Sequence, residues 1–418
     1  MRFIHAADLH IDSPLRGLSR YEGAPVEQLR SATREAFKKL VDLAIYEKVQ
    51  FVILAGDIYD GEWQDFHTGL FFRGEMIRLQ QKAIRVFIVH GNHDAESVIT
   101  RQLDLPSNVK VFSSRKAETV KINELSVAIH GRSFPNRAVD EDLVPSYPEP
   151  ITACFNIGIL HTSLSGNAAH DTYAPCHKET LIEKGYDYWA LGHVHMREVV
   201  CDMPRIIFSG NLQGRHAKET GAKGCELVTV KLGMIKSEFV ALDVVRWHQI
   251  SICLDRIDTL QAVATAFREK LKPLLLEADD QLHAVRVQLN GSTDLHAIEA
   301  NQPGTLDAAI RAAAQDVDDS KIWIEKVKLS LITRLDRTQL GQRDDAIGEL
   351  VHLVDMMAQD EHGLTRLIEQ EINAVLKLPH GMDNDGDMAF DNHETRLKLL
   401  HDAEATVLAR LSNMGEQS

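Results

Sequence analysis

Side chains that bind metals recur at five places in the N-terminal half of the chain, each time directly after an apolar run. In chain order they are Asp8 and His10 in AADLHIDSP, Asp57 in LAGDIYDGE, Asn92, His93 and Asp94 in VHGNHDAE, His161 in GILHTS, and His193 and His195 in ALGHVHMRE. Carboxylates, imidazoles and amide oxygens are the ligands of divalent metals of intermediate softness, such as Mn²⁺, Fe²⁺ or Zn²⁺. Because so many ligands exceed the needs of one ion, they predict a dinuclear site with a bridging carboxylate and metal centres about 3.5 to 4 Å apart.

Each of these motifs has a plainer interpretation when it is taken alone. A DxH or GD pair after a strand is common in turns, because aspartate and glycine favour tight backbone bends. The GHxH pair is more specific, since two histidines at alternate positions of an extended segment point to the same side. The five motifs follow one another with room for a β/α unit between them, and we therefore interpret the set as one functional site.

The elements that would position these side chains are short strands separated by helices or loops. Apolar and β-branched runs predict strands over 2–6, 50–54, 85–89, 155–160, 186–191, 205–208 and 226–231. The segment SATREAFKKLVDLAIYEK has helical periodicity, and Ser31 is its expected N-cap. This alternation predicts an α/β fold with sheets covered by helices. Each polar cluster would then lie at the carboxyl end of a strand, where open α/β sheets gather their ligands.

Two further regions are expected beyond a first domain over residues 1–245. Strands over 248–255, 283–291 and 322–329 alternate with helices over 258–276 and 306–316, which predicts a small α/β capping domain over 246–332. Helices over 337–358, 361–377 and 391–412 give a helical C-terminal region over 333–418.

The helical C-terminal region has two features of its own. Its apolar residues recur at helical spacing and either pack onto the core or offer a stripe to a coiled-coil partner; they are Leu350, Val354, Met357, Leu364, Leu367, Ile368 and Ile372. The segment DNDGDMAFDNHE, residues 383–394, has the carboxylate spacing of a calcium-binding EF-hand loop. Met388 stands where the sharp turn of such a loop needs glycine, so we interpret the segment as an acidic loop.

The composition is that of a soluble globular protein, with 44% hydrophobic and 26% charged residues. Five widely spaced cysteines without a CxxC pair predict reduced thiols and a cytoplasmic location. No apolar run reaches the roughly 20 residues of a membrane span, so no membrane partner is expected. The formal net charge is −15, but residues 331–418 hold 8 Lys/Arg and 17 Asp/Glu, or −9, which leaves −6 for the rest. Because most of the negative charge lies in residues 331–418, the net charge does not exclude DNA as a binding partner.

The ordered motifs DxH, GDxxD, GNHD, H and GHxH resemble the calcineurin-like metallophosphoesterases. The resemblance implies two β-sheets packed face to face with helices outside. It also implies that Asp8, His10, Asp57 and His195 bind the first metal. The second metal would be bound by Asp57 as the bridge, with Asn92, His161 and His193.

His93 has no metal in this scheme, and the chemistry of phosphodiester hydrolysis gives it a different role. The reaction needs a nucleophile, stabilisation of charge, and a proton for the leaving oxygen. Metal binding lowers the pKa of water towards neutrality and so supplies the nucleophile. His93 is then the candidate that protonates the leaving alkoxide, with Asp94 holding its ring by a hydrogen bond. In the same motif we expect Gly91 to provide the turn.

The substrate is suggested by two further segments, DLHIDSPLRGL and IIFSGNLQGRHAKETGAKGCELVTV. They resemble the SbcD-like DNA repair exonucleases, and in particular the YhaO-like branch. This resemblance implies DNA-end or double-strand-break processing, an SbcC-like coiled-coil ATPase partner that binds the helical region, Mn²⁺ as the metal (with Fe²⁺, Mg²⁺ or Zn²⁺ as alternatives), and a homodimer. Arg215, His216 and Lys218 lie in a basic, glycine-rich stretch that would contact the phosphates of the substrate. The alternative for this stretch is a solvated hairpin loop.

Two other functions stay open at this point. One is a phosphodiesterase or phosphatase for small or lipid-linked phosphates, which would not account for the regions after residue 245. The other is a catalytically silent scaffold for the ATPase, which would have no use for a full set of ligands and an acid. No GxxxxGK[ST] motif occurs, so any use of ATP would belong to a partner.

Overall fold

The computed structural model describes residues 1–13, 23–60, 66–96, 104–164, 173–276, 280–332, 334, 337–375 and 392–415. Of the acidic segment predicted over 383–394, residues 383–391 lie outside the described residues. The chain forms two compact units, which divide between Trp247 and His248. The capping and helical regions expected from the sequence both fall in the second unit.

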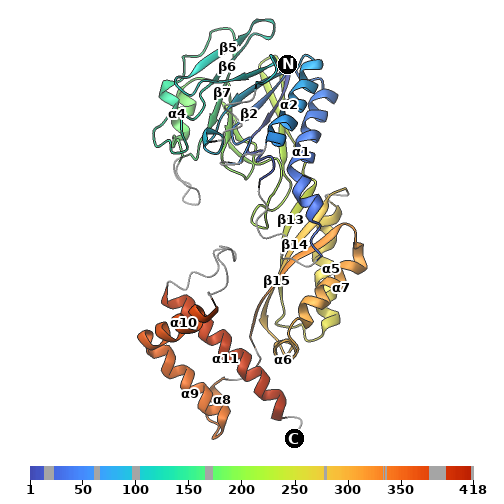
Figure 1. Cartoon of the computed structure of the whole chain (residues 1–418), viewed down its shortest axis with the longest axis vertical. Helices are drawn as coiled ribbons and strands as arrows, with labels where there is room; N and C mark the ends of the chain where they lie inside the picture. The colour runs from blue at the N-terminus through green and yellow to red at the C-terminus, as the bar shows by residue number, and fades with distance from the viewer. Residues whose placement is uncertain are drawn as a thin grey trace. The chain divides into compact units, whose positions relative to one another are not determined.

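The first unit contains two six-stranded sheets (Figure 1). The first sheet has the order β12 (Met234–Ala241), β11 (Gly224–Lys231), β1 (Arg2–Ala6), β2 (Phe51–Ala55), β3 (Arg85–Val89) and β4 (Val109–Val111). The second has the order β5 (Glu118–Ile122), β6 (Val127–Gly131), β7 (Phe155–His161), β8 (Tyr188–Gly192), β10 (Arg205–Phe208) and β9 (Glu198–Cys201). Strands β1 to β4 are parallel, as are β6, β7, β8 and β10. The predicted α/β fold with two sheets is confirmed.

Apolar side chains fill the space between the two sheets and the space beneath the helices. Phe3 and Phe51 of the first sheet pack with Ile157 and Tyr188 of the second in one buried cluster. Helices α1 (Val26–Tyr46) and α2 (Phe66–Gln81) cover the outer face of the first sheet, and α4 (Lys178–Glu183) covers the second (Figure 1). The parallel strands are buried on both faces, as expected for sheets between helices.

Helix α1 begins six residues earlier than its sequence pattern suggested, with Pro25 and not Ser31 at the N-cap. Ser31 lies inside the helix, where its Oγ donates to the carbonyl of Gln28 at 3.3 Å, so its assignment as the N-cap is wrong. The helix extends back to Val26 because Leu29 is buried against the core and Pro25 precedes the first turn. Proline suits a helix start, since its fixed φ is compatible with the helix and its missing N–H needs no partner there.

The second unit begins with a small α/β layer. Strands β13 (Val245–Cys253), β14 (Leu282–Ser292) and β15 (Ile322–Ile332) form one sheet. Helices α5 (Leu260–Leu276) and α7 (Thr305–Asp318) pack on it through Phe267, Val287 and Ile310. A short helix that the sequence pattern did not predict, α6 (Leu295–Asn301), precedes α7.

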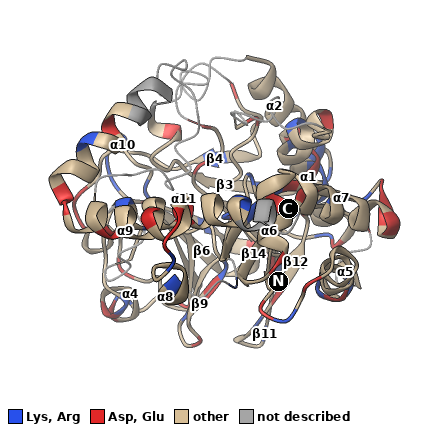
Figure 2. Cartoon of the chain, turned by 90° about the horizontal axis from the view of Figure 1, so that it is seen from below, with Lys and Arg blue, Asp and Glu red and all other residues tan. Residues whose placement is uncertain are grey.

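Helices α8 (Arg337–Leu340), α9 (Ala346–Gln359), α10 (Glu361–Val375) and α11 (His393–Gly415) complete the second unit. The prediction of a single helix over 337–358 is wrong. The helix is interrupted after Leu340, and a second helix begins at Ala346. Asp345 caps α9 there by accepting from the backbone N–H groups of Ile347 (3.1 Å) and Gly348 (3.2 Å). Acidic positions recur along α9 to α11 (Figure 2). Within the described part of the chain, none of the helices combines the length and apolar character that a membrane span requires.

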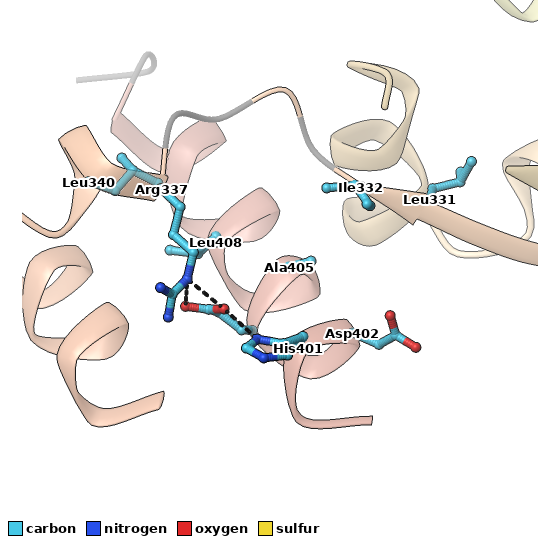
Figure 3. A pocket seen from close by; sticks show the side chains of 9 residues that line it. Leu331, Ile332, Arg337, Leu340, His401, Asp402, Ala405 and Leu408 are labelled. Carbon is cyan, nitrogen blue, oxygen red and sulfur yellow. Dashed lines mark hydrogen bonds and ion pairs between the residues drawn. The ribbon is translucent and has the colours of Figure 1, made fainter. Parts of the chain in front are cut away.

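A hollow of about 210 Å³ lies between the end of β15 and helices α8 and α11 (Figure 3). Leu331, Ile332, Leu340 and Leu408 contribute its apolar surface. Beside them Arg337 Nε donates to Glu404 Oε1 at 2.9 Å, and the Glu404 side chain is only 4% exposed. This ion pair ties α8 to α11.

Candidate metal centre

The strand ends bring together all five polar clusters found in the sequence. β1, β2 and β3 are parallel neighbours, so their carboxyl ends lie along one edge of the first sheet. β7 and β8 are parallel neighbours in the second sheet. The side chains follow these strands: Asp8 and His10 after β1, Asp57 after β2, Asn92, His93 and Asp94 after β3, His161 at the end of β7, and His193 and His195 after β8.

The backbone at these positions adopts conformations that most residues avoid. The φ angles of Asp8, His10, Asp57 and His193 are 51°, 43°, 51° and 98°, all in the left-handed region. Such a conformation costs a non-glycine residue on the order of 1–3 kcal/mol. Surrounding hydrogen bonds hold it, including those from Asp8 N to Gly56 O and from His10 N to Asp57 O, both 3.0 Å. Strain repeated at neighbouring polar side chains is typical of a functional site.

Two groups of ligand atoms form where these loops meet. The first contains Asp8, His10 and His195, the second contains Asp57, His161 and His193, and the ligand atoms within each group lie within 4.8 Å of one another. Asn92 joins the second group, with its Oδ1 3.0 Å from His161 Nε2. Oδ2 of Asp57 lies 3.4 Å from Nε2 of His161 and 3.9 Å from Nε2 of His10, so this carboxylate faces both groups. A thiolate-free set of carboxylate, imidazole and amide donors arranged in this way fits two divalent cations.

Three of the imidazole rings are fixed by acceptors on their outer sides. Nδ1 of His10 lies 3.0 Å from Asp60 Oδ1, and Nδ1 of His195 lies 2.7 Å from Glu219 Oε1. Nδ1 of His161 lies 2.9 Å from the carbonyl oxygen of Ala55. Each acceptor favours the tautomer with the proton on Nδ1, which turns the lone pair of Nε2 towards the ligand groups.

Asp60 also contacts His93, and this corrects the prediction made for Asp94. Nδ1 of His93 lies 3.1 Å from Asp60 Oδ1, and His10, Asp60 and His93 form a third close group. Burial lowers the pKa of His93, but the hydrogen bond to Asp60 and the charge of Asp57 outweigh it, so the pKa is raised.

Asp94 holds the backbone instead of the ring of His93. Its side chain accepts from the N–H groups of Ile58 (2.9 Å), Tyr59 (3.0 Å) and Gly91 (3.2 Å), and it is fully buried. Burial, helped by repulsion from Asp57, raises the pKa of Asp94 to about 7. The oxygens of Asp94 accept from the backbone while Nδ1 of His93 contacts Asp60, so we replace Asp94 with Asp60 as the residue that orients the His93 ring.

Comparison with known proteins places this centre in a family. The calcineurin-like phosphoesterase family model matches residues 1–197, and the model for the middle domain of metallophosphoesterase YhaO matches residues 247–332. The uncharacterized metallophosphoesterase YhaO of Bacillus subtilis is 32% identical over 359 residues, which cover 85% of this chain and 87% of that protein. The chain belongs to the calcineurin-like metallophosphoesterases. Members of this family use a dimetal centre.

Two archaeal proteins described as DNA double-strand break repair protein Mre11 are more distant relatives. The protein from Thermoplasma acidophilum is 21% identical over 388 residues, covering 88% of this chain and 97% of its own length. The protein from Methanopyrus kandleri is 24% identical over 217 residues, covering 47% of this chain and 45% of its own length.

Gly91 serves this metallophosphoesterase centre through its small size. It does not have a positive φ, so the turn itself does not require glycine. A Cβ at this position would lie 2.3 Å from Asp57 Oδ1 and 2.8 Å from His161 Nε2. The expectation that the turn needs glycine is therefore not met. Glycine is needed here because the backbone lies close to the side chains of Asp57 and His161.

The three residues predicted to contact substrate differ in their surroundings. The side chain of Arg215 is 16% exposed and lies against Asp60 and Glu219. His216 and Lys218 are exposed, and Nε2 of His216 is 3.8 Å from Glu219 Oε1. The rest of the expected basic stretch is engaged internally, since Lys223 is buried and its Nζ donates to the carbonyl of His195 at 2.8 Å. Arg197 likewise pairs with buried Glu226.

Two carboxylates of the centre, one largely buried and one buried, were not identified from the sequence. Asp60 is the second aspartate of the GDxxD motif, which carried a signal, but no role was assigned to it. Glu219 lies four residues after Arg215 in the sequence. Nothing in the surrounding residues indicates that its side chain contacts His195, as it does in the structure. Contacts between loops of different strands create both roles, so spacing within one motif does not show them.

Proposed function

We propose that the protein is a two-metal phosphodiesterase that acts on DNA as an exonuclease of the SbcD-like type. The observation that carries the proposal is the pair of ligand groups joined by Asp57, with His93 at their edge. In this proposal the first metal is bound by Asp8, His10, Asp57 and His195, and the second by Asp57, Asn92, His161 and His193. Mn²⁺ is the metal we expect.

Each side chain of the centre then has a defined task. The two cations would supply positive charge for the phosphate oxygens and lower the pKa of the attacking water. His93 would donate a proton to the leaving oxygen, because it belongs to neither of the two ligand groups that Asp57 faces and a third of its side chain is exposed. Asp60 would hold the His93 ring through Nδ1 so that Nε2 faces the substrate. Of Arg215, His216 and Lys218, the exposed His216 and Lys218 stay our candidates for contact with the substrate, whereas the guanidinium of Arg215 faces Asp60 and Glu219.

Support for DNA as the substrate comes from the relatives and from the size of the chain. Proteins described as DNA double-strand break repair protein Mre11 align with up to 88% of this chain, well beyond the phosphoesterase domain. A hydrolase of small phosphates would have no evident use for a capping layer and four further helices. We therefore favour DNA-end processing over hydrolysis of small or lipid-linked phosphates.

The test is Mn²⁺-dependent digestion of end-labelled linear duplex and single-stranded DNA by the purified protein. His93→Ala and Asp57→Asn serve as inactive variants, and bis(p-nitrophenyl) phosphate serves as a small control substrate. Shortening of DNA from an end by the wild type, lost in both variants, would support the proposal. Hydrolysis of the small ester alone, with DNA intact in the presence of an SbcC-like ATPase, would contradict it.

We further propose that the helical region binds an SbcC-like coiled-coil ATPase and that the protein is a cytoplasmic homodimer. Val354, Leu364 and Ile368 are buried within the helices, whereas Met356 and Leu367 are 63% and 41% exposed and available to a partner. All five cysteines are free thiols, which suits a reducing compartment. Co-elution with the ATPase, lost on Met356→Glu and Leu367→Glu substitution, tests the partner. Sedimentation equilibrium of the protein alone tests the dimer.

A further inference from the structure

The guanidinium of Arg215 lies between two carboxylates of the metal centre. Nη1 is 3.5 Å from Asp60 Oδ2, and Nη2 is 3.2 Å from Glu219 Oε1. Nη1 also donates to Ser13 Oγ at 3.4 Å. Both terminal nitrogens therefore already face acceptors of the protein, in a side chain that is only 16% exposed.

These two carboxylates orient three imidazoles that come from three different loops. Asp60 holds His10 and His93 through their Nδ1 atoms, at 3.0 and 3.1 Å. Glu219 holds His195 through its Nδ1 atom at 2.7 Å. The imidazoles in the loops after β1, β3 and β8 are thus oriented by only two carboxylates, Asp60 and Glu219. Arg215 contacts both carboxylates.

Glu219 is itself anchored close to Arg215. Its Oε2 accepts from the backbone N–H of Arg215 at 2.7 Å and from Asn211 Nδ2 at 3.0 Å, while Oε1 faces the guanidinium and His195. Glu219 is 7% exposed, so its charge is largely removed from water and needs a compensating cation. A planar guanidinium can contact two carboxylates at once, whereas a lysine ammonium is a single point charge.

We propose that Arg215 is a positioning residue of the metal centre, acting through Asp60 and Glu219 on the rings of His10, His93 and His195. The inference rests on the dimetal centre of the proposed function and does not depend on DNA as the substrate. Without the guanidinium, two neighbouring acids lose their shared counter-charge and no longer hold the rings in one geometry. The expected consequence falls on the first metal, whose ligands include His10 and His195, and leaves the second metal little changed.

The experiment is calorimetric titration of the full-length, metal-free protein with Mn²⁺ alone, comparing wild type, Arg215→Met, Arg215→Lys and Glu219→Gln. We expect Arg215→Met and Glu219→Gln each to weaken one of two Mn²⁺ sites about 10- to 100-fold, the usual effect of removing a group that orients a ligand. The double variant Arg215→Met/Glu219→Gln, titrated in the same way, should bind Mn²⁺ only slightly more weakly than the worse single variant, because both changes break one network. Arg215→Lys should recover only part of the affinity.

Lys236 and Glu238 provide a matched control, because they form an exposed ion pair on β12 with side chains 71% and 50% exposed. Lys236→Met and Glu238→Gln should leave both Mn²⁺ affinities unchanged. If Arg215→Met binds two Mn²⁺ ions as the wild type does and only raises KM for bis(p-nitrophenyl) phosphate, Arg215 binds the phosphate and the proposal is overturned. If that variant does not fold, Glu219→Gln and Arg215→Lys decide the question in the same titration. The result is independent of whether the wild type digests DNA.

Discussion

His93 and Asp60 form the contact that defines the acid of the centre, with Nδ1 of the imidazole 3.1 Å from Oδ1 of the carboxylate. The same oxygen lies 3.0 Å from Nδ1 of His10. One carboxylate therefore orients both an expected metal ligand and the expected proton donor. Because the two rings share this acceptor, a change at Asp60 affects metal binding and proton transfer together.

Substitution of Asp60 separates its role from that of Asp94. We expect Asp60→Asn to lower kcat for bis(p-nitrophenyl) phosphate about 10- to 100-fold, because His93 loses its anionic acceptor. Asp94→Asn should keep kcat within a few-fold, while the loss of the acceptor for the Gly91 N–H destabilises the fold by about 1–2 kcal/mol. Steady-state kinetics and urea unfolding of both variants check this. The reverse pattern, with kcat lost only in Asp94→Asn, would restore Asp94 as the orienting residue.

Much of this arrangement was predictable from the sequence. The apolar runs predict the first and last residues of β1, β3 and β10 correctly. These strands are buried on both faces, and polar turn residues mark their ends. Parallel strands place their carboxyl ends at one edge, so the sequence predicts that Asp8, Asp57 and Asn92 lie close together.

Contacts between loops were not predictable in the same way. Adjacency in sequence suggests that Asp94 holds His93, but Asp94 begins a 3₁₀ turn (Asp94–Glu96) and its side chain accepts from the N–H groups of Ile58 and Tyr59. The edge strands β4, β5, β9 and β12 were also not predicted, since they are mostly half-exposed and lack a continuous apolar run. The buried strand β6 was not predicted either.

Gly91→Ala should damage the metal centre without unfolding the protein. The backbone tolerates alanine because φ is not positive, but the added Cβ would lie 2.3 Å from Asp57 Oδ1. We expect at least about a 10-fold loss of Mn²⁺ affinity, measured by calorimetry, since both groups share Asp57. Gly74→Ala is the matched control, because a Cβ there meets nothing within 4 Å and alanine stabilises a helix interior by about 0.5–1 kcal/mol. Unchanged Mn²⁺ binding in Gly91→Ala would show that the two side chains move aside at little cost.

Removal of metal should lower the thermal stability of the first unit. All the ligand groups lie in this unit, and a ligand present at about 100 times its Kd stabilises the state that binds it by about 2.7 kcal/mol. For a unit of this size that corresponds to a Tm lower by roughly 5–10 °C after chelation. Differential scanning calorimetry with and without Mn²⁺ measures the shift. Asp57→Asn should abolish it, and a shift of equal size in that variant would mean that the stabilising ions bind elsewhere.

His5 should make the stability of the metal-free protein depend on pH. It is completely buried, with Nδ1 3.0 Å from the Tyr188 hydroxyl and Nε2 3.1 Å from the carbonyl oxygen of Leu191. Burial lowers its pKa to about 3, against about 6.5 in the unfolded chain, although the hydrogen bond to Leu191 opposes the shift.

As the pH falls from about 6.5 towards 3, the unfolded chain therefore binds a proton that the native protein excludes. The free energy of unfolding contributed by His5 then decreases by up to about 1.4 kcal/mol per pH unit, and above pH 6.5 it is unaffected. Urea unfolding in the presence of chelator, between about pH 5 and 6.5, gives the free energy of unfolding as a function of pH. In His5→Gln the slope of this free energy against pH should be shallower by the equivalent of about one proton. His352→Gln, at an exposed position, should keep the wild-type slope. An equal slope in His5→Gln and wild type would mean that His5 takes up its proton without unfolding, and that the buried contact between β1 and β8 tolerates a charge.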